Sequence, residues 1–153
     1  MIRPAVPEDI YRLVEMARAF WAETGWGDRA EFDVESFAFT AGTLMDRGVL
    51  LVSVADDGNV VGMAGAGLAQ AWWNRNVLTA QEIFWYCEKG HRKGLGRQLM
   101  TNLEAAVASL GVKLFSMSAE EGLRSKALGR LYRQRGYIPS EMLFWKELSG
   151  VAQ

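Results

Sequence analysis

The chain has 153 residues, of which 50% are apolar and 23% charged, and its formal net charge is −1 at pH 7. This length predicts one domain, residues 1–153, that can bury a core, and the balanced charge argues against a nucleic-acid partner or a membrane surface. The single cysteine excludes an internal disulfide, and the sequence shows neither a secretory signal nor an apolar run long enough for a membrane span. We therefore expect a cytoplasmic protein.

The first half of the sequence predicts a short strand, two helices and a hairpin. The short strand is expected at residues 2–6. Apolar residues then recur every three or four positions over residues 10–21, which predicts an amphipathic helix, and a second helix is expected at 34–47. The turn sequence DDGN separates two apolar runs, at residues 49–55 and 59–69, and this arrangement predicts a β-hairpin.

The second half alternates strands with helices. Strands are expected at residues 80–88, 112–118 and 137–148, and helices at 95–110 and 123–135. The resulting order, β-α-α-β-β-β-α-β-α-β, is typical of an α/β fold with one mixed sheet and helices on its faces.

A glycine-rich, basic segment, CEKGHRKGLGRQLM at residues 87–100, joins the third long strand to the following helix. It does not fit a Walker loop, because Lys93 has the wrong spacing, or a dinucleotide fingerprint, because Leu99 occupies the position of the third glycine. A helix that opens at Gly94 and Gly96 would still point its first amides and positive dipole end at an anion. The segment therefore predicts a phosphate or diphosphate site, with a solvated basic turn as the alternative.

Three motifs together resemble the GNAT acyltransferase superfamily. HRKGLGRQLM is similar to its cofactor motif, Gln/Arg-x-x-Gly-x-Gly/Ala, which lies after the fourth strand at the start of a long helix. LYRQRGYIPSEMLFWKEL resembles its C-terminal signature, and IRPAVPEDI resembles its first strand and helix start. The likeness spans nearly the whole chain. It implies a single GNAT domain with one mixed central sheet of about six or seven strands and about four helices.

The resemblance implies acetyl-CoA as the co-substrate and no metal. Backbone amides of the basic segment would bind its diphosphate, and the pantetheine arm would pair with the preceding strand. His91 stands where the motif has Gln or Arg, a change that bears on affinity more than on cofactor identity. Ser125 falls near the place of a family asparagine that contacts pantetheine. The expected cofactor residues are Trp85, Tyr86, His91, Arg92, Lys93, Gly94, Leu95, Gly96, Arg97 and Ser125.

Acetyl transfer to an amine requires a neutral amine, a polarised thioester carbonyl and a proton for the leaving thiolate. Tyr132 matches the family tyrosine that protonates the CoA sulfur, and a phenol is a neutral donor at pH 7; a tyrosine of the core is the alternative. Glu82 is the only acid within an otherwise apolar strand and resembles a general-base glutamate of some GNAT enzymes. Partial burial would raise the pKa of this carboxyl and suit it to act as a base. The alternative is a carboxylate at the strand edge or end that only faces solvent.

Three tryptophans in loop-like sequence, Trp26, Trp72 and Trp73, are candidates for the acceptor site, where an aromatic face could bind a cation, an apolar group or a nucleobase. Packing of a core or lid is the alternative. We expect an N-acetyltransferase that acts on a primary amine of a small molecule or peptide. A catalytically silent acyl-CoA-binding module and an enzyme that acetylates a nucleic-acid base remain as alternatives. The apolar residues 142–145 could pair across a homodimer.

Overall fold

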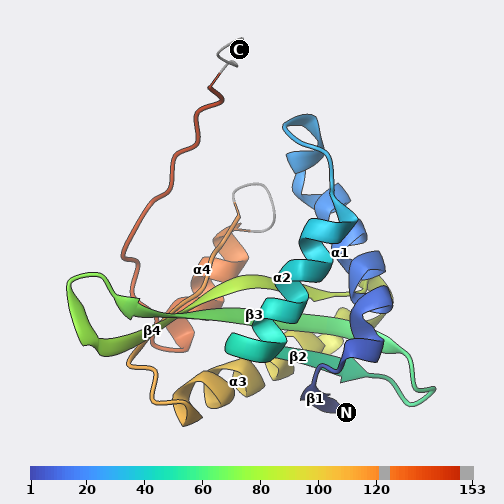
Figure 1. Cartoon of the computed structure of the whole chain (residues 1–153), viewed down its shortest axis with the longest axis horizontal. Coiled ribbons are helices and arrows are strands. Elements are labelled where there is room, and N and C mark those ends of the chain that lie inside the picture. Colours follow the sequence, from blue (N-terminus) through green and yellow to red (C-terminus); the bar gives the residue numbers. More distant parts are fainter. Residues whose placement is uncertain (121–124, 149–153) are drawn as a thin grey trace.

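The computed structural model describes residues 1–120 and 125–148 and shows one mixed sheet with helices on both faces (Figure 1). The strands are β1 (Ile2–Pro4), β2 (Val49–Val54), β3 (Val60–Ala71), β4 (Asn74–Cys87) and β5 (Leu114–Ser116). The α-helices are α1 (Ile10–Thr24), α2 (Val34–Arg47), α3 (Arg92–Ser109) and α4 (Ser125–Gln134). Short 3-10 turns lie at Pro7–Asp9, Trp26–Asp28 and Lys89–His91. The predicted α/β fold class is confirmed.

The strands lie in the order β1-β2-β3-β4-β5, antiparallel except for the parallel pair β4 and β5. Helices α1 and α2 cover one face, and α3 covers the other (Figure 1). The first core contains Leu13, Met16, Leu44, Val52, Met63 and Phe84. The second contains Leu51, Ala64, Ala66, Leu99, Leu103 and Val107. Because β2 and β3 are covered on both faces, their sequences are continuous apolar runs rather than alternating ones.

Local side chains set the helix ends. The Asp33 carboxylate accepts a hydrogen bond from the Ser36 amide at 2.7 Å and so caps the start of α2. Helix α1 ends at Thr24 and is followed by Gly25, whose φ of 73° is a left-handed conformation that glycine adopts without a steric penalty. These signals explain why the expected bounds of the second helix, 34–47, coincide with those of α2.

A β-bulge divides β4 into two parts. Gly65 of β3 pairs with Phe84, but its neighbour Ala66 pairs with Glu82, which leaves Ile83 as an extra residue. Adjacent residues of β3 face opposite sides of the sheet, and so must their partners on β4. Glu82 therefore shares the α3 side with Ala66, whereas Phe84 belongs to the core beneath α1 and α2.

The outer edge of β4 is paired over only part of its length. Residues 79–81 pair with Leu114–Ser116 of β5, and β4 then continues to Cys87 beyond the described part of that pairing. Backbone groups on the second half of the strand are thus available to an added, strand-like ligand.

The predicted last strand, 137–148, is wrong in this structure. This segment carries no regular secondary structure and stands out from the body of the molecule (Figure 1). A strand requires a hydrogen-bonded neighbour, and none of the described strands pairs with residues 137–148. The sheet therefore has five strands within the described residues rather than six or seven. The large apolar side chains left exposed are Ile138, Met142, Leu143, Phe144, Trp145 and Leu148.

Candidate active site

The two predicted catalytic residues meet at Ser118. Glu82 is 9% exposed, and its Oε2 accepts a hydrogen bond from the Ser118 amide at 3.2 Å. The hydroxyl of Tyr132, on α4, donates to the Ser118 carbonyl oxygen at 2.6 Å. The structure thus brings together two side chains that are fifty positions apart, through the segment that follows β5.

Burial gives these two groups complementary acid–base properties. It raises the pKa of Glu82 to about 7, although the hydrogen bond from Ser118 opposes this shift. Burial, and to a lesser degree the Glu82 carboxylate, also raise the pKa of the Tyr132 phenol above its usual value. Near pH 7, Glu82 can therefore accept a proton while Tyr132 remains protonated and able to donate one.

Trp85 connects this pair to the start of α3. Its indole Nε1 donates to the Gly96 carbonyl oxygen at 3.1 Å, and its ring centroid lies 6.5 Å from that of Tyr132. A Cβ at position 96 would lie 3.2 Å from the Trp85 ring, closer than most real contacts. Gly96 therefore allows α3 to approach β4 closely.

Residues 88–97, called the glycine loop below, expose free backbone amides at one end. Lys93 and Gly94 depart from helical geometry, with Gly94 at a φ of 81°, so the regular part of α3 begins after Gly94. The first amides of that part have no acceptor within the helix. The His91 amide, by contrast, donates to the Glu88 carbonyl oxygen at 2.9 Å. Among the described residues, the exposed Lys93 and Arg97 form no ion pair.

Two other predicted cofactor residues have side chains that turn toward α1. The Arg92 guanidinium donates to both carboxylate oxygens of Glu23, at 2.9 and 3.0 Å, and lies over the Tyr86 ring, 5.4 Å from its centroid. Tyr86 is itself buried in the core beneath α1 and α2. Only the backbone of Tyr86 therefore belongs to the open edge of β4. Ser125 is half-buried at the described start of α4, next to residues 121–124, which lie outside the described part.

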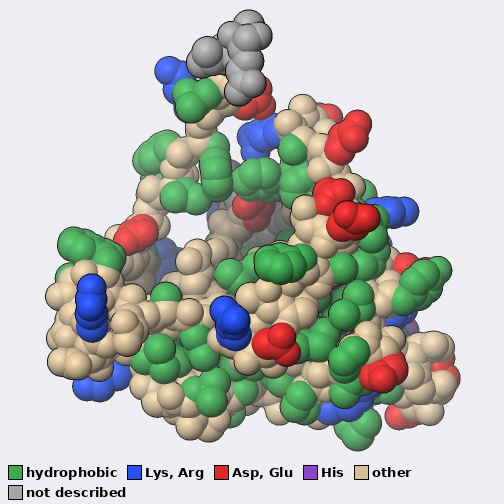
Figure 2. All heavy atoms as spheres, viewed as in Figure 1, with side chains coloured by type: hydrophobic (Ala, Val, Ile, Leu, Met, Phe, Trp, Pro, Cys, Tyr) green, Lys and Arg blue, Asp and Glu red, His purple; other side chains and the backbone are tan. Residues whose placement is uncertain are grey.

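Trp26 is the predicted acceptor residue that contacts Glu120, two positions after Ser118. The Trp26 Nε1 donates a hydrogen bond to Glu120 Oε1 at 3.1 Å. The Trp145 ring packs edge-on against the Trp26 ring, with 5.4 Å between centroids, and the Arg29 guanidinium lies 5.2 Å from the Trp26 ring centroid. A pocket of about 430 Å³ lies here, lined by Trp26, Arg29, Ala30, Trp145, Lys146 and Glu147. Figure 2 shows an open space between the C-terminal segment and the body of the molecule.

Sequence reasoning missed Glu120 and did not place Trp145 among the acceptor candidates. One available signal was the place of Glu120 just after the strand expected at 112–118. In α/β sheets, residues beyond the carboxyl ends of parallel strands commonly contact ligands.

Trp72 and Trp73 lie at the tip of the β3–β4 hairpin and are 94% and 56% exposed. At the rise of an extended strand, the eight steps from Asn74 to Glu82 place this tip roughly 25 Å from the buried carboxylate. The structure does not bring these tryptophans together with the other candidate residues.

The buried Cys87 thiol is poorly suited to act as a nucleophile. Burial raises the pKa of the Cys87 thiol to about 11, so little thiolate is present for nucleophilic attack. No described helix is long and apolar enough to cross a membrane. Across residues 1–120 and 125–148, no three His, Cys, Asp or Glu side chains are grouped so that they could hold a metal ion.

Several solved structures of similar fold are described as acetyltransferases and share little sequence with this chain, whereas one from Bacillus halodurans is described as a transcriptional regulator. One is a "predicted acetyltransferase with acetyl-CoA" from Clostridium acetobutylicum, with a TM-score of 0.74, 15% identity, and coverage of 97% of this chain and 95% of that one. A second is an aminoglycoside acetyltransferase from an uncultured soil metagenomic sample in complex with trehalose, with a TM-score of 0.72, 16% identity, and coverage of 97% of this chain and 96% of that one. A third is a ribosomal-protein-alanine N-acetyltransferase from Brucella melitensis, with a TM-score of 0.69, 17% identity, and coverage of 97% of this chain and 99% of that one.

Sequence comparison gives the family directly. None of the curated proteins matches this chain at a significant level. The model of the Acetyltransferase (GNAT) family, however, matches residues 11–137, which is most of the chain and includes the glycine loop, Glu82 and Tyr132. The fold, with its mixed sheet and partly open β4 edge, agrees with this match. The chain belongs to the GNAT acetyltransferase family.

Proposed function

We propose that this chain is one N-acetyltransferase domain that moves an acetyl group from acetyl-CoA to a primary amine of a small molecule or peptide. The observation that carries the proposal is the placement of Glu82 and Tyr132 on either side of Ser118, beside the open edge of β4. A base and an acid at one end of a ligand-binding edge are what direct acetyl transfer to an amine requires.

The residues present fit CoA. Free amides after Gly94, with the exposed side chains of Lys93 and Arg97 beside them, suit a diphosphate. The second half of the β4 edge, which pairs with no described strand, suits the amide groups of a pantetheine arm, as in recognition by strand addition. Ser125, at the start of α4, could add a hydrogen bond. When bound, acetyl-CoA supplies the acetyl thioester, and the chain supplies binding, orientation and proton transfer.

The proposed chemistry needs no covalent enzyme intermediate. Glu82 removes a proton from the acceptor ammonium, directly or through a water molecule, so that the nitrogen lone pair can attack the thioester carbonyl. The new C–N bond forms as the C–S bond breaks, and Tyr132 gives its hydroxyl proton to the departing sulfur. As the amide forms, the nitrogen loses its remaining surplus proton, and the raised pKa of Tyr132 favours uptake of that proton by the phenolate, directly or through water.

Trp26 is proposed as part of the acceptor site, together with Glu120 and Trp145. An aromatic surface with a neighbouring carboxylate suits an amine, which is a cation before it loses its proton. The structural relatives include an aminoglycoside acetyltransferase and a ribosomal-protein-alanine N-acetyltransferase, which supports testing both small molecules and peptides as acceptors. Trp72 and Trp73 could contact only a distant part of an extended acceptor.

An acceptor screen tests this function. Purified protein with acetyl-CoA is mixed with aminoglycosides, small apolar amines, or peptides with a free N-terminal alanine or lysine, and released CoA thiol and acetylated product are both measured. We expect at least one class to raise CoA release above hydrolysis without amine, with matching acetylated product in mass spectra. Tight acetyl-CoA binding without any amine-dependent release would instead support a silent acyl-CoA-binding module.

A further inference from the structure

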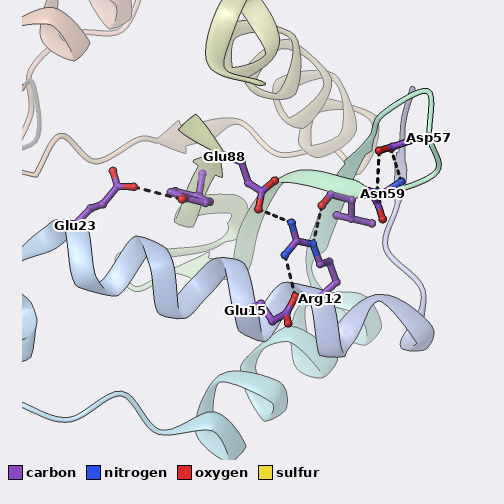
Figure 3. A network of polar contacts seen from close by, with 8 residues as sticks. Arg12, Glu15, Glu23, Asp57, Asn59 and Glu88 are labelled. Carbon is purple, nitrogen blue, oxygen red and sulfur yellow. Dashed lines mark hydrogen bonds and ion pairs between the residues drawn. The ribbon is translucent and has the colours of Figure 1, made fainter. Parts of the chain in front are cut away.

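Helix α1 contacts Glu88, the first residue of the glycine loop. The Arg12 guanidinium pairs with the Glu88 carboxylate and also donates to the Val60 carbonyl oxygen at 3.1 Å and to Glu15 at 2.9 Å (Figure 3). Glu88 is itself fixed to the sheet, because its amide donates to the Val61 carbonyl oxygen at 3.0 Å. Arg12 therefore ties α1 to the point where the chain leaves β4.

The same helix contacts the loop again at Arg92. The Glu23 carboxylate accepts two hydrogen bonds from Arg92 and one from the Tyr86 hydroxyl, at 3.3 Å, and lies 3.9 Å from the Lys89 ammonium. Figure 3 shows Glu23 on α1 pointing toward the end of β4. Arg92 is further held by its Nε, which donates to the Cys87 carbonyl oxygen at 2.9 Å. The guanidinium is thus engaged on three sides.

The two contacts act from one face of α1 and have opposite polarity. Arg12 and Glu23 are eleven positions apart, about three helical turns, so they point in the same direction with roughly 16 Å between them. The helix supplies the cation at Glu88 and the anion at Arg92. A shift or rotation of α1 would separate both pairs at once, so together they fix the loop against one orientation of the helix.

We propose that Arg12 and Glu23 are positioning residues that brace residues 88–92, and that Arg92 acts as a strut within this brace rather than as a ligand of the CoA diphosphate. The proposal rests on the proposed function, since it assumes that the amides after Gly94 receive a diphosphate. Its physical basis is preorganisation: a loop already held in the binding conformation loses less conformational freedom when the ligand binds.

Two readings of the Glu23–Arg92 pair predict opposite effects of Glu23→Gln. If the pair is a brace, the substitution loosens the loop and weakens CoA binding by about tenfold, the scale of a charged hydrogen-bonded pair. If Glu23 only withholds Arg92 from the diphosphate, the substitution frees a cation and tightens binding. The sign of the change therefore decides between them.

The experiment measures the Kd of CoA by calorimetry for the full chain, for Glu23→Gln, for Arg92→Gln and for the double variant. We expect both single variants to bind about tenfold more weakly and the double variant to be no weaker, because residues of one pair are not additive. The kcat at saturating acetyl-CoA should stay within about twofold while KM rises. Glu35→Gln removes the same charge from an exposed site on α2 and should leave Kd unchanged.

A second readout needs no ligand. Hydrogen exchange of the amides at residues 93–97 should be faster in Glu23→Gln and Arg92→Gln than in the unchanged chain, with equal melting temperatures excluding general unfolding. Unchanged exchange, additive losses of affinity, or tighter binding by Glu23→Gln would each overturn the brace. If the unchanged chain bound no CoA while the exchange rates changed as expected, the proposed function would fail and the mechanical link alone would stand.

Discussion

Tyr132→Phe is expected to lower kcat by about 10²–10⁴-fold, the scale of general acid catalysis, without changing the Kd of acetyl-CoA. The substitution removes only the hydroxyl that donates to the Ser118 carbonyl oxygen. The ring remains to pack against Trp85 and Tyr137, with centroid separations of 6.5 and 5.6 Å. The leaving sulfur then lacks its proton donor. Steady-state kinetics with a reactive amine, together with calorimetric binding of acetyl-CoA, measure the two effects separately.

Tyr137→Phe is the matched control. Tyr137 lies in the same aromatic cluster, but its hydroxyl donates to Glu104 at 2.8 Å rather than to Ser118. We expect its kcat to stay within about twofold of the unchanged enzyme. Equal rates for Tyr132→Phe and the unchanged enzyme would remove Tyr132 from the mechanism, and equal losses for both variants would indicate a packing effect.

Glu82→Gln is expected to lower kcat/KM by about 10²–10⁴-fold and to abolish its dependence on pH near neutrality. A base must be ionised to act, and burial raises the pKa of Glu82 to about 7. In the unchanged enzyme, kcat/KM should therefore rise with pH and level off above about 7. A pH series with an acceptor whose amine titrates well above this range isolates the enzyme group. If kcat/KM of Glu82→Gln still rose with pH over the same range, that rise would belong to another titrating group.

The same carboxyl should make stability depend on pH. Its pKa is about 7 in the folded chain and 4.5 in the unfolded chain, so between these values the folded state holds the extra proton. Stability attributable to Glu82 should therefore fall as pH rises through this window, by about 3 kcal/mol of unfolding free energy in total. Glu82→Gln has no carboxyl to titrate here, so its unfolding free energy should rise relative to that of the unchanged chain as pH increases from 5 to 8, roughly the span of the two pKa values.

Denaturant unfolding at several pH values measures this difference. Glu104→Gln is the control. The Glu104 carboxylate accepts hydrogen bonds from Arg135 and Tyr137, and, despite partial burial, these contacts hold its pKa below its usual value, opposite to the shift at Glu82. Its stability relative to the unchanged chain should not improve across the neutral range. Parallel pH curves for Glu82→Gln and the unchanged chain would contradict a buried, proton-binding Glu82.

Local signals made much of the fold predictable from sequence. The second helix has a capping aspartate, Asp33, at one end and Gly48 at the other, and its expected and observed bounds agree. The hairpin of β2 and β3 follows from two apolar runs around a turn that contains Gly58, where φ is 85°. The glycine loop was predictable for the same reason, since Gly94 occupies a backbone conformation that other residues rarely adopt.

Long-range pairing limited the rest. The bulge at Ile83 depends on registration with β3, so the sequence alone did not show that Glu82 and Phe84 face opposite sides. The final strand had the right composition, but a strand also needs a hydrogen-bonded partner, and none of the described strands pairs with residues 137–148. Likewise, the basic segment indicated an anion site, yet the partner of Arg92 proved to be Glu23, which lies sixty-nine positions away.

Calorimetric titration of the purified chain with acetyl-CoA, CoA, ATP and NAD determines whether the glycine loop and the open edge of β4 together form a CoA site. We predict binding of acetyl-CoA and CoA with Kd values on the order of micromolar, and much weaker binding of ATP and NAD, which lack the pantetheine arm. Failure of both CoA species to bind would contradict the account and leave the glycine loop as a solvated turn.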